Sequence, residues 1–302
     1  MSRESFRRTL RGKGPVSLKT HPSKKREGEI LHIAKSPVVT MAPTTPIYDA
    51  VQMMAKEGFR RIPIANPGTK TLEGIVTATD IIDYLGGGKK FEIIQQKYGG
   101  NIFKAINEPI RLIMTKNVVS IKTSAKISEA IALMTEKNLG GLPVVDEENH
   151  VRAIITERDI ANMFADRISD IKVSQLMSEK VVTALPTTTI FEVEKTVTTQ
   201  GFRRLPIISD GKVVGIITTM DIIRFFGSGE VFTYLRSGAI VQVLNTPALK
   251  IAIKNVATIS PNADVGQAAK IMRDKDIGAV PVVVNDKIVG IITERDFFKI
   301  IE

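Results

Sequence analysis

The sequence predicts a mixed α/β (α+β) fold built from four copies of one β-α-β-β-α unit, each about 50 residues long. Two observations carry this prediction. Short sequences return along the chain: GFRRIPI (58–64) as GFRRLPI (201–207), and NLGGLPVV (138–145) as DIGAVPVV (276–283). Each copy also has a proline that is followed 15 to 17 residues later by an aspartate, and a threonine stands three residues before that aspartate. Four copies in one register indicate a repeat protein.

The first two elements of the unit are a β-rich segment and a helix. The segments are SPVVT, NVVSI, KVVTA and NVATI, whose β-branched residues favour strands. In TPIYDAVQMMAKEGF, apolar residues recur at helical spacing, which predicts an amphipathic helix. We expect Thr45 as its N-cap, Pro46 as its first residue and Gly58 as its stop. The apolar face of this helix contains Ile47, Ala50, Val51 and Met54.

Two strands and a second helix complete the unit. A strand such as RIPIAN is followed by a turn (NPG, DEEN, SDG or VND) and a second strand (GIV, AII or GII). The final helix begins around the Thr-x-x-Asp sequence. A unit of this size buries too little apolar surface to be stable alone, so we expect sheets and helices of neighbouring units to pack together.

The domain organisation follows from differences among the copies. Repeats 1 and 3 share FRR, whereas repeats 2 and 4 share TERD, so the chain is a duplicated pair of repeats. We place one two-repeat module at about 36–165 and the other at about 175–302. The predicted segments, in order, are a basic tail (1–35), repeat 1 (36–85), a helical connector (86–113), repeat 2 (114–165), repeat 3 (175–226), a second helical connector (227–251) and repeat 4 (252–302).

The composition excludes several kinds of site. The 302 residues include no cysteine, which excludes disulfides, zinc–thiolate sites and cysteine nucleophiles. The three histidines, His21, His32 and His150, form no metal-ligand pattern, and we interpret them as exposed to solvent. No apolar run reaches the roughly 20 residues of a membrane-spanning helix, and the N-terminus lacks the apolar stretch of a secretory signal. We therefore expect a cytoplasmic protein without a metal site.

The net charge of +10 belongs mainly to the N-terminal tail. Residues 1–35 contain ten Lys or Arg residues and three Glu residues, a net charge of +7. The tail has no clear apolar periodicity, which predicts disorder. A basic tail is one way to bind nucleic acid, but Phe6 is its only Phe, Tyr or Trp residue, so stacking on bases is poorly supplied.

Three features of the repeat resemble those of CBS domains: the proline-centred strand, the G-I-I-T-x-x-D turn into a helix, and the upstream V-x-T/S. The resemblance covers nearly all of 36–302, and four copies in constant register make it highly specific. A chain of four such repeats resembles the gamma subunit of AMP-activated protein kinase and, more closely, its stand-alone archaeal counterparts. The resemblance implies two pseudo-symmetric Bateman modules (pairs of CBS repeats) packed as a disk, with nucleotide clefts between repeats.

The resemblance also implies which residues contact the adenosine part of a nucleotide. An ionised carboxylate can accept hydrogen bonds from both ribose hydroxyls, and in the family the aspartate of Thr-x-x-Asp has this role. All four repeats keep it here, whereas the kinase gamma subunit lacks it in one repeat. The matching residues are Thr77, Asp80, Thr156, Asp159, Thr218, Asp221, Thr293 and Asp296. The residues that would flank the adenine are Thr40, Ser120, Thr183 and Thr258 on the first segment, and Ile62, Leu142, Leu205 and Val280 before each proline.

Arginines provide positive charge for phosphates at two positions of the repeat, and the family places basic residues at both. Arginines precede the prolines of repeats 1 and 3 and the aspartates of repeats 2 and 4, so each repeat has arginine at only one position. We therefore expect repeats 1 and 2, and repeats 3 and 4, to share clefts that contain both kinds. The predicted phosphate-binding residues are Arg60, Arg61, Arg158, Arg203, Arg204 and Arg295.

A purely structural explanation competes with this one. Thr-x-x-Asp at a helix start is close to a capping box, which satisfies free backbone amides and needs no ligand. Capping and ribose binding can coexist, however, and the recurrence of the whole set in four repeats favours a ligand.

The predicted function is a regulatory sensor that binds AMP, ADP or ATP and signals energy status to a protein partner or through self-association. S-adenosylmethionine or a dinucleotide is an alternative ligand, although the arginines favour a phosphorylated one. Nucleic acid is an alternative partner through the tail alone, and no membrane partner is predicted. Catalysis and a catalytic cofactor are not expected, because the sequence has no Gly-x-x-x-x-Gly-Lys loop and no nucleophile elbow.

Overall fold

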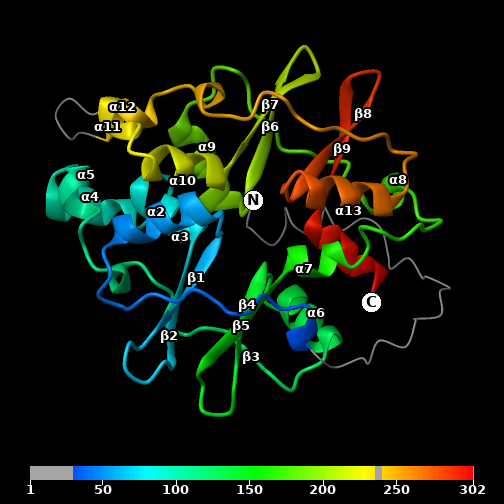
Figure 1. Ribbon diagram of the computed structural model, residues 1–302. Coiled ribbons are helices and arrows are strands. Elements are labelled where there is room, and N and C mark those ends of the chain that lie inside the picture. The colour runs from blue at the N-terminus through cyan, green and yellow to red at the C-terminus, as the bar shows by residue number, and fades with distance from the viewer. Residues whose placement is uncertain (1–29, 235–239, 302) are drawn as a thin grey trace. The chain divides into compact units, whose positions relative to one another are not determined.

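The computed structural model describes residues 30–234 and 240–301, and it shows a mixed α/β fold with four repeats of one type (Figure 1). The chain falls into two compact units. The odd unit combines repeats 1 and 3 (Val39–Val118 with Val182–Val256). The even unit combines repeats 2 and 4 (Val119–Val181 with Ala257–Glu302) and includes the described residues before Val39, 30–38. Packing within each unit joins alternate repeats, which the duplication in the sequence did not indicate.

The odd unit contains two repeats, each followed by a connector of short helices. Repeat 1 and its connector contain α2 (Ile47–Glu57), β1 (Arg61–Ala65), β2 (Leu72–Thr77), α3 (Ala78–Ile82), the π-helical η2 (Asp83–Gly87), α4 (Phe91–Tyr98), α5 (Ile102–Ala105) and the 3₁₀ helix η3 (Ile110–Leu112). Repeat 3 and its connector contain α9 (Ile190–Gln200), β6 (Arg204–Ser209), β7 (Lys212–Thr218), α10 (Thr219–Gly227), α11 (Val231–Tyr234), α12 (Val241–Leu244) and the 3₁₀ helix η4 (Ala248–Lys250). Helix α2 packs on α10, and α9 packs on η2. Figure 1 shows α2 and α3 beside α9 and α10.

The even unit contains the other two repeats. Repeat 2 contains β3 (Ile121–Lys122), α6 (Ile127–Glu136), β4 (Gly141–Val145), β5 (Val151–Thr156) and α7 (Glu157–Asn162), and the 3₁₀ helix η1 (Ile30–His32) belongs to the same unit. Helix α8 (Val173–Leu176) precedes repeat 3 in the sequence but belongs to this unit. Repeat 4 contains α13 (Val265–Asp274), β8 (Ala279–Val284), β9 (Lys287–Thr293) and the 3₁₀ helix η5 (Glu294–Ile300). Within this unit α7 packs against η5 and α13.

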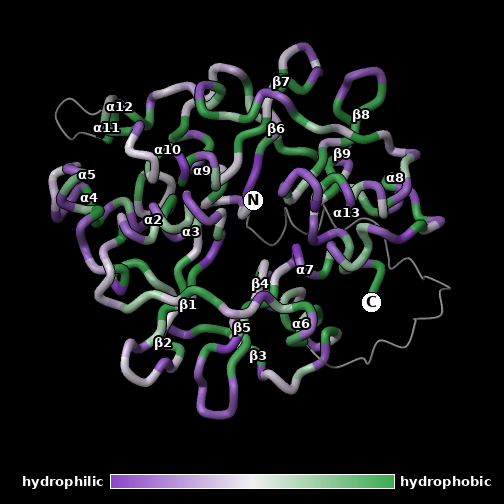
Figure 2. The backbone as a smooth tube through the Cα atoms, viewed as in Figure 1, coloured by the Kyte–Doolittle hydropathy of each residue, from purple (hydrophilic) through white to green (hydrophobic). Residues whose placement is uncertain are grey.

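The two predicted strands of each repeat form an antiparallel hairpin. The proline of the first strand faces an isoleucine of the second in all four hairpins: Pro63 with Ile75, Pro143 with Ile154, Pro206 with Ile216, and Pro281 with Ile291. The strands carry apolar residues whereas the turn between β4 and β5 is hydrophilic (Figure 2). The hairpins therefore bring the residue before each proline and the Thr-x-x-Asp threonine to the same end of the repeat.

The β-rich segment that opens each repeat is shorter than the sequence predicted. Repeat 2 has a two-residue strand, β3, parallel to β4, whereas the other repeats have one parallel bridge each. In repeat 2 the ladder continues because the amide of Thr123 donates to the carbonyl of Val145 (3.0 Å). The residues at the position of Thr123 in repeats 1, 3 and 4 are prolines, which have no amide hydrogen to donate. These prolines are Pro43, Pro186 and Pro261.

The first helix of repeat 1 begins one residue later than predicted and has a different cap. Its N-cap is Pro46, whose side chain makes no capping bond, and Thr45 is not the cap. The free amides at the helix start are instead satisfied by the connector: Ile47 N–H donates to the carbonyl of Glu108 and Tyr48 N–H to that of Ile106, both at 2.9 Å. The end of the helix is as predicted, with Gly58 in the left-handed region (φ 71°).

The predicted tail ends earlier than residue 35. Residues 1–29 lie outside the described residues, but residues 30–35 pack onto repeat 2. Ile30 is fully buried and shares a core cluster with Ala34 and Leu142. The amide of Lys35 donates to the carbonyl of Ile154 on β5 (2.8 Å), so this segment extends the hairpin of repeat 2.

The cores of the two units differ in continuity. One cluster of buried residues runs through the odd unit, from α2 and α3 to α9 and α10. The even unit has two clusters that exchange residues: Phe298 of repeat 4 lies in the cluster of repeat 2, and Phe164, which follows α7, lies in that of repeat 4. Among the described residues, no helix has the length and apolar character needed to cross a membrane.

Candidate functional site

The Thr-x-x-Asp sequence adopts the same geometry in all four repeats. The threonine is the N-cap of the final helix, with an extended backbone. One carboxylate oxygen of the aspartate, Oδ2, accepts two hydrogen bonds from that threonine: one from its N–H at 2.7–2.9 Å and one from its hydroxyl at 2.6–2.8 Å. The predicted capping is therefore present in every repeat, and it uses only one of the two carboxylate oxygens.

The second oxygen, Oδ1, has different surroundings in different repeats. In repeat 1 it accepts a hydrogen bond from Lys90 Nζ (2.7 Å), a residue of the connector. In repeat 3 its partner is Arg224 Nη1 (3.0 Å), and in repeat 4 it is Lys299 Nζ (2.8 Å). In repeat 2, Oδ1 of Asp159 has no hydrogen bond or ion pair with the residues that the structure describes.

Burial acts on two of these carboxylates. It raises the pKa of Asp159, because the hydrogen bonds from Thr156 only partly offset the loss of water and the charge of Glu294 adds to the effect. It also raises the pKa of Asp221, in spite of the hydrogen bonds from Thr218 and the charge of Arg224. At both carboxylates an added hydrogen-bond donor would stabilise the ionised form.

The residues predicted to flank adenine are brought to the same part of each repeat as the aspartate. The residues before the prolines are all on strands, with side chains almost fully buried in the core: Ile62, Leu142, Leu205 and Val280. Their side chains are thus part of the hydrophobic core, and only their backbone groups are available to a base. The hydroxyl residues each stand one position before the parallel bridge, half-buried at Thr40, Ser120 and Thr183 and exposed at Thr258.

The arginine pairs of repeats 1 and 3 lie at the start of the final helix. The carbonyl of Arg60 accepts the amide of Ala78 (2.9 Å), and the carbonyl of Arg203 accepts that of Thr219 (3.0 Å). Arg61 faces Thr77 across the hairpin, and Arg204 faces Thr218 in the same way. These four arginines are half-buried and stand beside the Thr-x-x-Asp sequence of their own repeat.

The arginines of TERD lie in a different environment, which the sequence did not reveal. Arg158 Nε donates to Glu294 Oε1 (2.8 Å), and Arg295 Nε donates to Glu157 Oε1 (2.6 Å). Each arginine thus crosses to the glutamate of the alternate repeat, and both glutamates are only 1% exposed. Arg158 also pairs with Asp276. We call this reciprocal set of four TERD residues the Arg–Glu clamp; a phosphate role for its arginines stays a prediction.

The clamp could be foreseen only in part. TERD in repeats 2 and 4 is visible in the sequence, but the partners in the clamp are separated by 136 and 138 positions. The corresponding residues of the odd unit are Ala78 and Thr79 in repeat 1, and Thr219 and Met220 in repeat 3. No pair of this kind can form there, because none of these side chains is ionisable. The nucleotide clefts expected between repeats 1 and 2, and between repeats 3 and 4, stay predictions.

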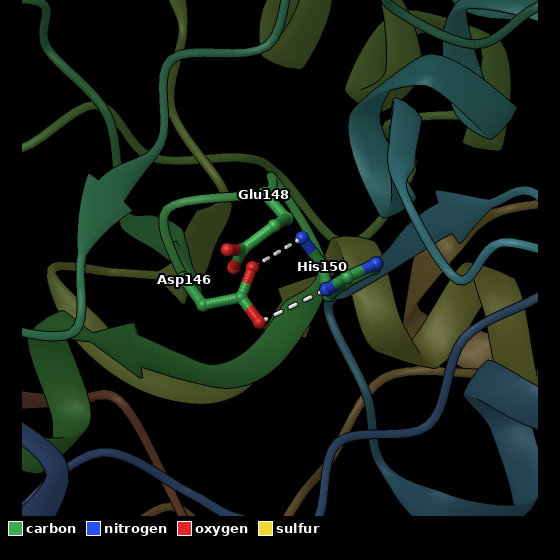
Figure 3. A group of neighbouring side chains, drawn as sticks. All are labelled: Asp146, Glu148 and His150. Carbon is green, nitrogen blue, oxygen red and sulfur yellow. Dashed lines mark hydrogen bonds and ion pairs between the residues drawn. The ribbon is translucent and has the colours of Figure 1, made fainter.

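One group of possible metal ligands was missed in the sequence. Asp146, Glu148 and His150, in the turn between β4 and β5, have ligand atoms within 4.8 Å of one another (Figure 3). Asp146 already accepts the backbone amide of His150 (2.8 Å), the His150 ring (3.0 Å) and Arg152 Nη2 (2.6 Å). Despite some burial, these bonds lower the pKa of Asp146 to about 2. Arg152 thus already provides the group with an internal cation.

Comparison with known proteins identifies the family. A model of the CBS domain matches residues 29–87, 110–166, 173–228 and 249–302. The chain is 39% identical over 264 residues to protein MJ1225 of Methanocaldococcus jannaschii, which covers 87% of this chain and 94% of that protein. It is also 29% identical over 267 residues to a 33.4 kDa protein from the ribosomal RNA operon of Thermofilum pendens, covering 88% of this chain and 89% of that protein.

Solved structures agree with these matches. The crystal structure of MJ1225, which has been proposed as an archaeal homologue of g-AMPK, has a TM-score of 0.85 at 38% identity and covers 90% of this chain and 99% of that one. A structure from Pyrococcus horikoshii, with a TM-score of 0.58 at 19% identity, shares the fold. The matched residues contain all four Thr-x-x-Asp sequences. The chain therefore belongs to the CBS-domain family and contains four CBS domains.

Proposed function

We propose that this chain is a non-catalytic, cytoplasmic sensor that binds AMP, ADP and ATP and passes energy status to a protein partner or to another copy of itself. The observation that carries the proposal is the recurrence of one carboxylate geometry in four repeats. In each repeat Oδ2 of the aspartate accepts a hydrogen bond from the threonine that caps the helix. A cap alone needs no second oxygen, so Oδ1 is the atom that we assign to ribose hydroxyls.

The surroundings of the carboxylates support a phosphorylated ligand. The carbonyls of Arg60 and Arg203 each accept a hydrogen bond from the first helical residue after the capping threonine, so both arginines lie beside the aspartate's helix. Guanidinium groups suit phosphate oxygens because they donate several hydrogen bonds in one plane. S-adenosylmethionine carries a positive sulfonium instead, which such arginines would repel. The similarity to MJ1225, proposed as a homologue of g-AMPK, supports nucleotide sensing further.

Calorimetry of the full chain with AMP, ADP, ATP and S-adenosylmethionine tests the proposal. We expect saturable heat with the three nucleotides, an affinity of about 1 μM, and more than one site per chain. The variant Asp221→Ala should weaken one site by roughly tenfold or more, because it removes a charge-assisted hydrogen bond of about 1.5–3 kcal/mol. Flat titrations with all three nucleotides would rule out the proposed function, and binding of S-adenosylmethionine alone would replace it with the alternative ligand.

The chain provides a matched control for Asp221. Glu192 has the same capping role in the same repeat, where its carboxylate accepts the Thr189 N–H (2.8 Å) and hydroxyl (3.0 Å). Glu192→Ala should cost about 1 kcal/mol of stability and leave nucleotide affinity unchanged. If Asp221→Ala behaves like Glu192→Ala, with a lower melting temperature and unchanged affinity per folded molecule, then Asp221 is only a cap.

A further inference from the structure

The four Thr-x-x-Asp carboxylates differ in how many hydrogen bonds they can still accept. A carboxylate has about four acceptor positions, two on each oxygen. In every repeat the capping threonine occupies two of them, both on Oδ2. A ribose diol needs two more, one for each hydroxyl. The positions on Oδ1 therefore decide whether a repeat can accept both hydroxyls at once.

An internal cation takes one of these positions in three repeats. Lys90 holds Asp80, and Lys299 holds Asp296. The two ammonium groups also share a second partner: Lys90 donates to the carbonyl of Ile113 (2.8 Å) and Lys299 to that of Leu176 (2.8 Å). Ile113 and Leu176 are equivalent, because each stands two residues before the bridge that extends its hairpin. The lysines thus reach one structural location from different places in the sequence.

Arg224 holds Asp221 from the position three residues after it, the position that Lys299 has in repeat 4. The Asp221 and Asp296 side chains are only 5% and 8% exposed. A diol that approaches these carboxylates must share them with a cation or displace it. With the cation in place, a single acceptor position is left for two hydroxyls.

Repeat 2 lacks this cation. The residue three positions after Asp159 is Asn162, whose side chain is exposed at the end of α7. The neighbouring Arg158 is directed to Glu294 and Asp276. Among the described residues, Oδ1 of Asp159 therefore has no partner, and Asp159 is half-buried rather than buried. Both acceptor positions on this oxygen are available.

We infer that repeat 2 holds the highest-affinity ribose site of the chain, because Asp159 alone can accept both ribose hydroxyls without displacing an internal cation. The inference rests on the proposed function and names the site that acts first. As nucleotide concentration rises, Asp159 engages a ribose before Asp80, Asp221 and Asp296. The cations of the other repeats set their lower affinities.

A reciprocal exchange of one residue tests the inference. Asn162→Lys places an ammonium group near Asp159, at the position of Lys299, and Lys299→Asn removes one from Asp296. Calorimetry with AMP measures the tightest binding phase of the full chain. We expect Asn162→Lys to weaken this phase by roughly tenfold, the effect of one charge-assisted hydrogen bond. Lys299→Asn should instead add a second tight phase.

Two further measurements attribute the effect to the diol. AMP and 2′,3′-dideoxy-AMP are compared, since only AMP has both hydroxyls, and the wild-type preference for AMP in the tightest phase should shrink in Asn162→Lys. Asn262→Lys is the charge control, because Asn262 is exposed in the turn before α13. This variant should leave the affinities for both AMP and 2′,3′-dideoxy-AMP unchanged. Lys299→Met, which keeps the apolar stem, replaces Lys299→Asn if the latter melts at a lower temperature.

The outcomes separate this inference from the proposed function. If no variant and no wild-type sample binds any adenine nucleotide, the proposed function fails and the inference fails with it. If AMP binds, Asp159→Ala should abolish the tightest phase, whereas Asp80→Ala, Asp221→Ala and Asp296→Ala should keep it. Nucleotide binding whose tightest phase survives Asp159→Ala, or is unchanged in Asn162→Lys, overturns the inference and leaves the function intact.

Discussion

The odd and even units join alternate repeats by different chemistry. In the even unit, two buried glutamates are each matched by an arginine of the other repeat, through Arg158–Glu294 and Arg295–Glu157. In the odd unit the corresponding residues cannot ionise, and one continuous apolar core joins the repeats. Against this apolar core lies Glu194 on α9, whose carboxyl is fully buried and has no hydrogen-bond partner among the described residues.

The comparison shows how one fold can bury carboxylates at different cost. A buried charge is tolerable when a partner and hydrogen bonds replace the lost water, and expensive when they do not. The glutamates of the Arg–Glu clamp have partners in the structure, whereas Glu194 does not. We therefore expect opposite results when each is disturbed: removal of a clamp arginine destabilises the even unit, and removal of the Glu194 carboxyl stabilises the odd unit.

The largest effect is expected from Arg295→Met. This change leaves Glu157 buried without its charge partner, which should cost about 3 kcal/mol of unfolding free energy. Thermal unfolding without nucleotide measures the loss, and amide hydrogen exchange should rise in α7 and η5 but not in α2 and α10. The double variant Glu157→Ala/Arg295→Met uses the residues that repeats 1 and 3 have at these positions, Ala78 and Met220, and should recover most of the stability.

An exposed arginine of the same unit provides the control. Arg273 donates to Asp166 (3.0 Å), whose side chain is 75% exposed. Arg273→Met should cost no more than about 1 kcal/mol, because water replaces the arginine at an exposed carboxylate. Equal losses for Arg273→Met and Arg295→Met would contradict the claim that burial gives the clamp its importance.

A smaller effect of opposite sign is expected from Glu194→Val. Burial raises the pKa of Glu194 well above its ordinary value, so the folded protein holds this proton more tightly than the unfolded chain does. Stability is therefore highest at pH values below the ordinary pKa and falls as pH rises towards the raised value. Valine is the residue at the equivalent position in repeat 1, Val51. At pH 8, Glu194→Val should raise the unfolding free energy by about 1–3 kcal/mol.

The pH dependence distinguishes charge from shape. The gain from Glu194→Val should shrink as the pH is lowered to 5, because the glutamate is then neutral in the folded state and less ionised in the unfolded chain. Glu194→Gln keeps the size and removes the titration, so its melting temperature should lose this part of the pH dependence. A constant difference between wild type and both variants from pH 5 to pH 8 would mean that Glu194 does not titrate in this range.

The sequence predicted local features well and contacts across repeats poorly. The order of elements, the stop at Gly58 and the capping role of Asp80 and its equivalents depend on neighbours in the chain, so their pattern is visible in the residues. The missing N-cap at Thr45 shows the limit, because the connector satisfies those amides from a segment about 60 residues away. The prolines that shorten the β-rich opening segments of repeats 1, 3 and 4 are visible in the sequence. Their effect could not be predicted, because it depends on the parallel pairing of that segment with the next strand.

The candidate site divides in the same way. The four aspartates could be predicted from their constant spacing to the prolines. Arg224 and Lys299 each stand one helical turn after the aspartate that they pair with, so these two ion pairs could also have been predicted from the sequence. Lys90 could not be foreseen, because the chain must turn through η2 before its ammonium group reaches Asp80. Glu157 and Glu294 gave no indication of their partners, which lie on the alternate repeat.

The smallest effect is expected from removing residues 1–29, which lie outside every matched CBS domain except for the first matched residue. The even unit gains its packed N-terminal segment from residue 30 onwards: Ile30 is fully buried and Lys35 pairs with Ile154. In the odd unit the equivalent pairing joins two residues of the same segment, Thr115 and Ile75.

A chain that begins at residue 30 should therefore keep its melting temperature and bind AMP within twofold of the full chain. A chain that begins at residue 36 loses a buried isoleucine and a strand partner, and should melt at a clearly lower temperature through the even unit alone. If removal of residues 1–29 already lowers AMP affinity tenfold, the basic segment takes part in nucleotide binding. Ile30 would then mark where the packed fold begins, but not where the nucleotide-binding part of the chain begins.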